Sequence, residues 1–362
     1  MIVPQVSTPP DPSIVPPSAG RWYRIWRVAR YVFGLAAVGA AIWAVSGKSD
    51  ELSGATSYLA NIRWEWVAIA LAAEAVSYLS YAAFQRRVLL AGRIRVGMTP
   101  MTGISLAANA IQSSLPGGVV FYTAYMFRQY RRFGADEVLS AWTFVAVSMV
   151  SFISLSVLAT VGLGMALGTG NALDLVEVIL GIVVVAALIV LAWIARARLV
   201  PHFAKALRLT QRFTHRPSPD VPAEELIDGW LARIGAVSPT KKDWVAAFTL
   251  AMGNWAADCA CLALAFLAVG AGVPWRGLLL AYGAGQLASI LPITPGGLGV
   301  VEGSLTIALV TFGGAEASTV AAVLVYRLIS FWLALPVGWG AWGTLTLVGR
   351  RNRQPVLQSS AA

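Results

Sequence analysis

The residues best placed to do chemistry are four ionisable side chains inside long apolar stretches: Glu74, Asp258, Glu302 and Arg327. A charged group at membrane depth is costly, so each of them needs a partner, a water-filled cavity or a function. One loop separates Glu302 from Arg327, and an ion pair between them would act either as a structural lock or as a gate. Asn254 precedes Asp258 by four positions, which places both on one face of a helix that we expect to look inward.

A second candidate site lies at two breaks, Pro116-Gly117-Gly118 and Pro295-Gly296-Gly297, each near the middle of an apolar stretch. Proline removes a helical hydrogen bond and glycine loosens the backbone, so each helix is interrupted there. A helix that restarts after a break presents free N–H groups and the positive end of its dipole, which can hold an anion such as a lipid phosphate. The alternative is that these glycines only let helices pack closely, as Gly299 and Gly303 would at a four-residue spacing.

The composition indicates that lipid surrounds the elements that carry these residues. Of the 362 residues, 57% are hydrophobic and 12% are charged, whereas a soluble globular chain carries about 25% charged residues. The apolar residues gather into runs of about 20 or more, which is the length that crosses a hydrocarbon layer of about 30 Å. A soluble core would not need such runs, so the sequence predicts a membrane protein.

Basic residues give the chain a net charge of +10, and their positions decide what that charge means. They cluster beside the ends of apolar segments, an arrangement that marks the cytoplasmic side and the anionic inner leaflet of a membrane. Nucleic acid is therefore not expected as a partner. We expect a multi-pass protein of the plasma membrane with both termini in the cytoplasm. The clusters lie at 21–30, 86–95, 128–132, 196–242 and 350–353.

The expected fold is all-α, a polytopic helical membrane protein with about six full spans and two re-entrant broken-helix hairpins. The hairpins at 99–127 and 277–312 contain the two proline-glycine breaks. Their half-segments of about 15 residues reach only about 22 Å as helices, which is too short to cross the bilayer. The full spans are expected at 28–45, 64–84, 138–167, 175–195, 244–269 and 320–348.

The two halves of the chain resemble each other and are expected to form an inverted-topology repeat. The two Pro-Gly-Gly motifs lie 179 residues apart, and the basic clusters place the hairpin bases on opposite sides of the membrane. Many transporters build a site near the midplane from broken helices in this way. The expected segments are a disordered Pro-rich leader at 1–20, a first membrane half at 21–195, a cytoplasmic basic loop at 196–243, a second half at 244–349 and a cytoplasmic tail at 350–362.

Sequence motifs of soluble enzymes are missing, so no catalytic residue and no cofactor is expected. The chain has no phosphate-binding Walker motif, no nucleophile elbow, no zinc-protease motif and no dinucleotide fingerprint. Cys259 and Cys261 point away from each other on a helix, and His202 and His215 have no ligand spacing. We therefore expect no metal site and a protein that is not an enzyme.

The second break carries a resemblance to a known family. The run Leu291–Gly303, followed by Gly313-Gly314 and then Val325-Tyr326-Arg327, resembles the C-terminal motif of the lysylphosphatidylglycerol synthase transmembrane-region family, whose members are described as flippase-like. The first break resembles the N-terminal motif of the same family, and the resemblance covers about residues 25–350. It implies the passage of a lipid, or of a lipid-linked amino acid or sugar, between leaflets.

Some positions match that family and others depart from it. Phe121 and Thr123 stand just after the first break, where family members often carry an acidic and a basic residue. Full-length synthases also carry a soluble aminoacyl-transfer domain, and only a short tail follows the last span here, so lysyl transfer is not expected. By resemblance the motif positions are Pro295, Gly296, Gly297, Gly299, Glu302 and Arg327.

Four functions fit these observations. The first is translocation or binding of a phospholipid or lipid-linked substrate between leaflets, with phosphate held at the broken-helix ends and Glu302 and Arg327 acting in gating or headgroup recognition. The second is an ion-coupled secondary transporter of a small polar solute, which an inverted repeat suits equally well. The third is an intramembrane transferase, and the fourth is an accessory scaffold for a separately encoded lipid-modifying enzyme.

Overall fold

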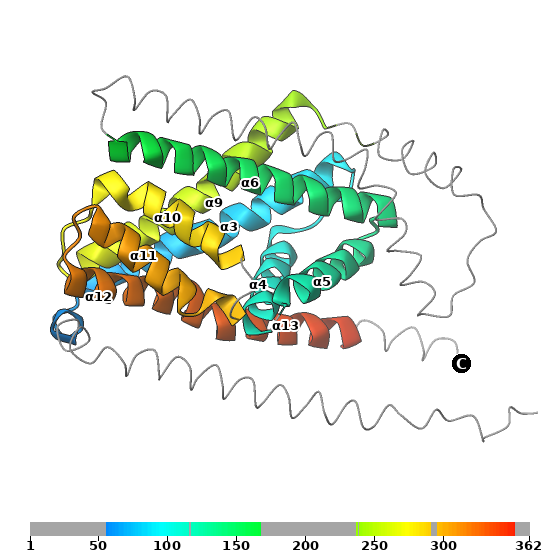
Figure 1. Cartoon of the computed structure of the whole chain (residues 1–362). Coiled ribbons are helices and arrows are strands. Elements are labelled where there is room, and N and C mark those ends of the chain that lie inside the picture. Colours follow the sequence, from blue (N-terminus) through cyan, green and yellow to red (C-terminus); the bar gives the residue numbers. More distant parts are fainter. Residues whose placement is uncertain (1–55, 116, 168–236, 238, 291–294, 352–362) are drawn as a thin grey trace, which may run out of the picture. The chain divides into compact units, whose positions relative to one another are not determined.

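The computed structural model describes residues 56–115, 117–167, 237, 239–290 and 295–351. All of them belong to one compact unit, Asp50–Ala362, and the described part of the chain is helical and contains no strand (Figure 1). The all-α fold is therefore confirmed. Several expected segments lie outside the described residues: the leader, the spans at 28–45 and 175–195, most of the basic loop and most of the tail.

Among the described residues, four helical segments are long and apolar enough to cross a membrane. They fall on the expected spans at 64–84, 138–167, 244–269 and 320–348. The first helix is longer than expected: it continues to Ala91, through the three polar residues Gln85 to Arg87. The total number of spans stays a prediction. The segments are α3 (Trp64–Ala91), α6 (Glu137–Leu167), α9 (Lys241–Ala268) and Glu316–Leu347, which comprises α12 (Glu316–Arg327), the π-helix η2 (Leu328–Leu333) and most of α13 (Ala334–Arg351).

The antiparallel pair α3 and α9 defines two ends of the bundle. At one end, the Arg63 N–H donates to the Ala268 carbonyl at 2.8 Å; at the other, Arg87 forms an ion pair with Asp243 at 2.8 Å. Asp243 is fixed there because it also shares a capping box with Thr240, the N-cap residue just before α9. We call these the Arg63 end and the Arg87 end.

The first broken helix forms a hairpin from α4 (Met98–Ser114) and α5 (Gly118–Arg132). Gly117 turns the chain with φ of 63°, in the left-handed region that glycine favours. A Cβ on Gly118 would lie 1.8 Å from the carbonyl oxygen of Gln112, so only glycine fits this close approach. The break is therefore a tight turn between two half-length helices, as the sequence predicted.

Both ends of this hairpin lie at the Arg87 end of the bundle. Val96, just before α4, packs in one buried cluster with Tyr130 near the end of α5 and with Leu89 near the end of α3. The basic segments 86–95 and 128–132 therefore lie on the same side. A hairpin satisfies this arrangement, whereas a single crossing would separate the two segments.

The second broken helix forms a hairpin that opens at the Arg63 end. It comprises α10 (Trp275–Ile290), the short turn η1 (Pro295–Gly297) and α11 (Val300–Thr311). A Cβ on Gly277 would lie 2.1 Å from the ring of Phe312, so the start of α10 touches the end of α11. Since α10 closely follows the end of α9, this base lies at the opposite end from that of the first hairpin.

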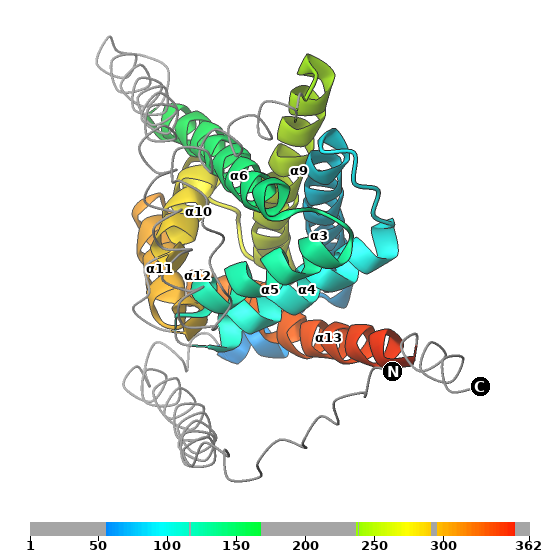
Figure 2. The ribbon, with the colours of Figure 1, turned by 90° about the vertical axis from the view of Figure 1, so that its right-hand side faces the viewer.

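The two hairpin tips meet in the interior of the described bundle. A Cβ on Gly296 would lie 3.1 Å from the carbonyl oxygen of Ser113, the next-to-last residue of α4. Figure 2, turned by 90° from Figure 1, shows the same elements from the side on which the first hairpin lies. The opposed hairpins agree with the expected inverted repeat, which stays a prediction because the spans at 28–45 and 175–195 lie outside the described residues.

The last span is regular except at its π-helical turn, which ends three residues before Pro336. Proline has no N–H to donate within a helix, so a local change of hydrogen bonding is expected beside it. Beyond this turn α13 packs against α4, where a Cβ on Gly338 would lie 2.4 Å from the Leu106 carbonyl oxygen. The last span therefore touches the second hairpin through α12 and the first through α13.

Candidate functional site

Polar side chains gather at two neighbouring places between these helices. We call the first the ion-pair site; it consists of Glu302, Arg327 and the backbone of Gly296. The second we call the carboxyl site; it is built around the acidic residues Glu74 and Asp258. The two sites are joined through α12, because Arg327 of the first follows Tyr326 of the second.

Arg327 is a buried cation with three partners. Its Nε–H donates to Oε1 of Glu302 at 2.6 Å, and a second guanidinium nitrogen donates to the Gly296 carbonyl oxygen at 3.1 Å. The guanidinium carbon also lies 4.3 Å from the ring centroid of Phe331, a cation–π arrangement. Arg327 is only 8% exposed, so it ties the break in the second hairpin to the last span.

The second oxygen of Glu302 occupies the start of α11. Oε2 accepts a hydrogen bond of 2.7 Å from the N–H of Gly299, which has a φ of 81°. A carboxylate at this position is stabilised by the helix dipole. The anion that we expected at the restarted helix is thus supplied by the chain itself. The Glu302 side chain remains 23% exposed.

The glycines at the second break are required by the backbone and by close packing. Gly296 and Gly297 have φ values of 62° and 69°, and a Cβ on Gly296 would lie 2.2 Å from the ring of Phe331. Pro295 begins this turn, whereas Pro116 of the first break lies outside the described residues. Close packing is therefore a definite role of these glycines, and a role in binding stays a prediction.

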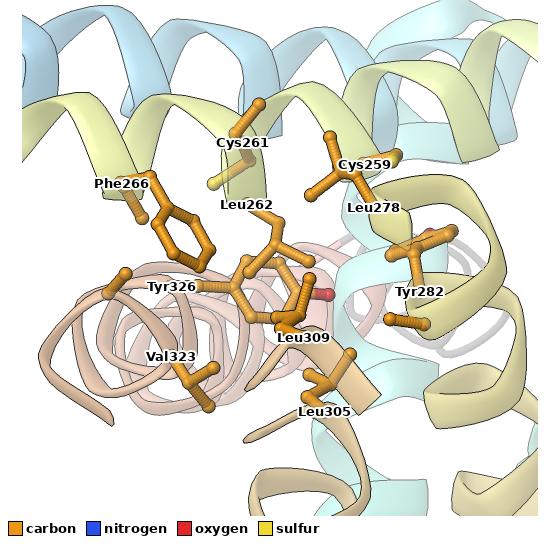
Figure 3. Close-up of a cluster of buried hydrophobic side chains, with 14 of the residues drawn as sticks. Cys259, Cys261, Leu262, Phe266, Leu278, Tyr282, Leu305, Leu309, Val323 and Tyr326 are labelled. Atoms are coloured by element: carbon orange, nitrogen blue, oxygen red, sulfur yellow. The ribbon is translucent and has the colours of Figure 1, made fainter. Parts of the chain in front are cut away.

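Asp258 is the centre of the carboxyl site. One carboxylate oxygen accepts hydrogen bonds from the Tyr282 hydroxyl at 2.7 Å and from the Gln286 amide at 3.1 Å, and the other accepts from the Tyr326 hydroxyl at 2.9 Å. These donors come from α10 and α12 and meet a residue of α9. Figure 3 shows both tyrosines within the buried apolar cluster, among side chains such as Leu262.

Glu74 of α3 completes the carboxyl site. Ser77 of α3 bonds to Asn254 of α9, and Glu74 and Asp258 lie one turn further along these antiparallel helices, so the two carboxyl groups face each other beside Cys261. Glu74 is 8% exposed, and its Oε2 atom has no hydrogen-bond partner among the described residues. One turn further on, Tyr78 accepts a hydrogen bond of 2.8 Å from Asn109 of the first hairpin. The site therefore connects α3 and α9 to both hairpins.

The structure joins some of the residues named from the sequence and separates others. Glu302 meets Arg327, and Glu74 meets Asp258, a pairing that the sequence did not predict. Asn254 lies beside the carboxyl site rather than in it, because its side-chain oxygen accepts a hydrogen bond of 3.1 Å from Ser77 of α3. The described residues contain no group of three His, Cys, Asp or Glu side chains that could hold a metal ion, and the expected absence of a metal site stays a prediction.

The sequence analysis missed Tyr78 and Tyr282, and it named Tyr326 only within the family motif. A local signal existed, because Tyr282 precedes Gln286 by four positions and Tyr78 follows Glu74 at the same spacing. Polar residues at this spacing share a helix face. Such a face within an apolar stretch predicts an interior polar site.

These helices define a polytopic helical membrane protein. The family model for the lysylphosphatidylglycerol synthase transmembrane region matches residues 27–338, and the chain belongs to this family. Two relatives from Methanothermobacter thermautotrophicus, both described as a UPF0104 membrane protein, are 37% and 34% identical to it over 91 and 93 residues. Each match covers 25% of this chain and 26% or 27% of the relative, so the chain matches about a quarter of the length of these curated relatives.

Proposed function

We propose that this protein binds a phospholipid or lipid-linked substrate with an anionic headgroup and moves it between the leaflets of the plasma membrane. The observation that carries the proposal is the ion-pair site. Arg327 is buried at the break of the second hairpin, and its counterion Glu302 is partly exposed. A buried guanidinium whose partner can be reached from outside is suited to receive the phosphate of a lipid.

In the proposed mechanism the headgroup phosphate replaces the carboxylate of Glu302. The phosphate takes the hydrogen bond from Arg327 and the N–H of Gly299, which Glu302 holds in the free protein. The cation and the helix start then keep an anionic partner, while the displaced Glu302 carboxylate, which is 23% exposed in the free protein, turns outward from the site. Release of the lipid returns Glu302 to both donors.

The hairpins supply the path for the headgroup. Their bases lie at opposite ends of the bundle and their tips meet, with Gly296 against Ser113. A headgroup that reaches the tips from one leaflet therefore needs to pass only this contact to reach the other leaflet, while its acyl chains stay in the bilayer. Interrupted backbone at membrane depth is tolerated where it is buried in protein or lines a water-filled cavity.

A second candidate, an ion-coupled transporter of a small polar solute, is favoured by the carboxyl site. Intramembrane acidic residues commonly serve proton or ion movement. The proposal of lipid movement takes precedence because the Arg327–Glu302 pair suits an anionic headgroup.

In the proposal of lipid movement the protein is not an enzyme, and both of its termini lie in the cytoplasm. Its basic loops contact the anionic inner leaflet. Any chemical modification of the lipid is carried out by a separately encoded enzyme.

Reconstitution into liposomes tests the proposal. We expect the wild-type protein to let a membrane-impermeant reductant reach labelled phospholipid from the inner leaflet much faster than in empty liposomes. Arg131→Ala is the matched control, because it removes an arginine from the exposed ion pair with Glu137, away from both sites, and should leave the rate unchanged. Uptake of a soluble solute driven by an ion gradient, without any lipid exchange, would favour the second candidate, and a chemically altered lipid would favour a transferase.

A further inference from the structure

We propose that Glu74 and Asp258 form a proton-binding site, and that the bound proton controls the ion-pair site through α12. The proton-binding part stands on the geometry of the carboxyl site alone. The coupling part rests on the proposed movement of lipid.

The surroundings of Asp258 favour its ionised form, so we assign it as the charged member of the pair. Three neutral donors, Tyr282, Gln286 and Tyr326, point hydrogen atoms at its two oxygens. Hydrogen bonds donated to a carboxylate stabilise its ionised form, and here they come from two different helices. Asp258 therefore needs no proton of its own to be satisfied.

Glu74 is placed where a carboxyl group must share a proton. It faces Asp258 across the α3–α9 contact, one turn from the Ser77–Asn254 hydrogen bond, and two like charges placed in this way disfavour the ionised form of one member. No cation among the described residues pairs with it, since the nearby Arg327 is bound to Glu302. Two carboxyl groups in hydrogen-bonding contact hold one proton between them. The titratable groups that face the pair are Tyr78 on α3, Cys259 and Cys261 on α9, Tyr282 on α10, and Tyr326 and Arg327 on α12.

An unpartnered oxygen supports this assignment. Oε2 of Glu74 has no hydrogen-bond partner among the described residues, although Glu74 is only 8% exposed. A buried carboxylate oxygen without a donor is costly, whereas a protonated carboxyl group has a hydrogen to give and less charge to desolvate. The site therefore favours a bound proton at Glu74 while Asp258 keeps its donors.

The protonation state of the carboxyl site affects the ion-pair site through two consecutive residues of α12. Tyr326 donates to Asp258, and Arg327 donates to Glu302. Loss of the proton adds a negative charge to the carboxyl site, and this charge attracts Arg327 away from Glu302 or from a bound headgroup. Protonation has the reverse effect. A proton gradient across the membrane would thereby bias binding and release of the lipid on the two sides.

Infrared difference spectroscopy of the full-length protein in liposomes tests proton binding without relying on transport. We expect a pH-dependent C=O band of a protonated carboxyl group that shifts in D2O. Glu74→Gln, which keeps the shape of the side chain, should remove this band. Glu137→Gln, a change at the partly exposed ion pair with Arg131, should retain it. The proposal is overturned if the wild-type protein lacks the band, if Glu74→Gln retains it, or if sodium rather than pH alters it.

Lipid exchange measured under an imposed pH difference tests the coupling. We expect the wild-type rate to respond to the pH difference and the Glu74→Gln rate to lose that response. Asp258→Asn, which keeps an acceptor oxygen for its donors, provides a second variant should Glu74→Gln fail to fold. A wild-type protein that exchanges lipid at the same rate at every pH difference refutes the coupling. A carboxyl band in a protein that exchanges no lipid refutes the proposed function and leaves the proton site standing.

Discussion

Arg327→Ala should reduce lipid exchange by about two orders of magnitude while the protein still inserts into the membrane. The variant removes the cation that Glu302, the Gly296 carbonyl and the ring of Phe331 share. Truncating one partner of a buried, hydrogen-bonded charge pair in a binding contact costs on the order of 3 kcal/mol of binding free energy, and each 1.4 kcal/mol corresponds to about tenfold in binding. Binding of an anionic lipid to the purified variant, measured by native mass spectrometry, should fall with the exchange rate.

Two companion variants separate headgroup binding from a structural lock. Arg327→Lys keeps the charge but loses the planar fork that grips Glu302 and Gly296 together, so it should restore only part of the activity. Glu302→Gln removes the competing carboxylate and should bind anionic lipid more tightly than the wild-type protein. If Glu302→Gln and Arg327→Ala instead lose folded protein to the same extent, with lipid binding unchanged in the part that folds, the pair is a lock.

Asp258→Ala should produce the largest loss of stability of any single change at these sites. It leaves the hydroxyls of Tyr282 and Tyr326 and the amide of Gln286 without their acceptor. Each buried donor left without an acceptor costs about 1–3 kcal/mol, so the free energy of unfolding should fall by roughly 5 kcal/mol. Thermal unfolding in detergent, followed by the fluorescence of the tryptophans, measures this loss.

The matched control for that prediction lies one helical turn earlier. Asn254→Ala removes a single hydrogen bond, the one from Ser77, and should cost about 1 kcal/mol. Both variants are on α9, so a general weakness of that helix would affect them equally. An Asp258→Ala protein that unfolds at the same temperature as Asn254→Ala would show that the carboxyl site does not hold α10 and α12 to α9.

The hairpins could be predicted because their cause is local. Proline and glycine interrupt a helix wherever they stand together, and the half-segments on either side are too short to span. The residues at which the helices end were harder to predict from the sequence. The first hairpin continues to Arg132 rather than to 127, because hydropathy reports where the apolar run stops and not where backbone hydrogen bonding stops.

The candidate sites could be predicted only in part. Glu302 and Arg327 were paired from the sequence because one loop separates two costly charges. Glu74 and Asp258 were each singled out for the same cost, but no local rule joins residues on helices so far apart in the chain. The occupation of the α11 start by Glu302 could have been anticipated, since an acidic residue three positions after the N-cap commonly bonds back to it.

Side labelling of single cysteines tests most directly the claim that the two hairpins open on opposite sides of the membrane. In a background without Cys259 and Cys261, cysteines would be placed at the exposed positions Arg95, Arg131, Arg276 and Glu316. A membrane-impermeant thiol reagent should reach the positions of Arg95 and Arg131 from one side and those of Arg276 and Glu316 from the other. Labelling of Arg95 and Arg131 positions from opposite sides would contradict the paired hairpins and the headgroup path built on them.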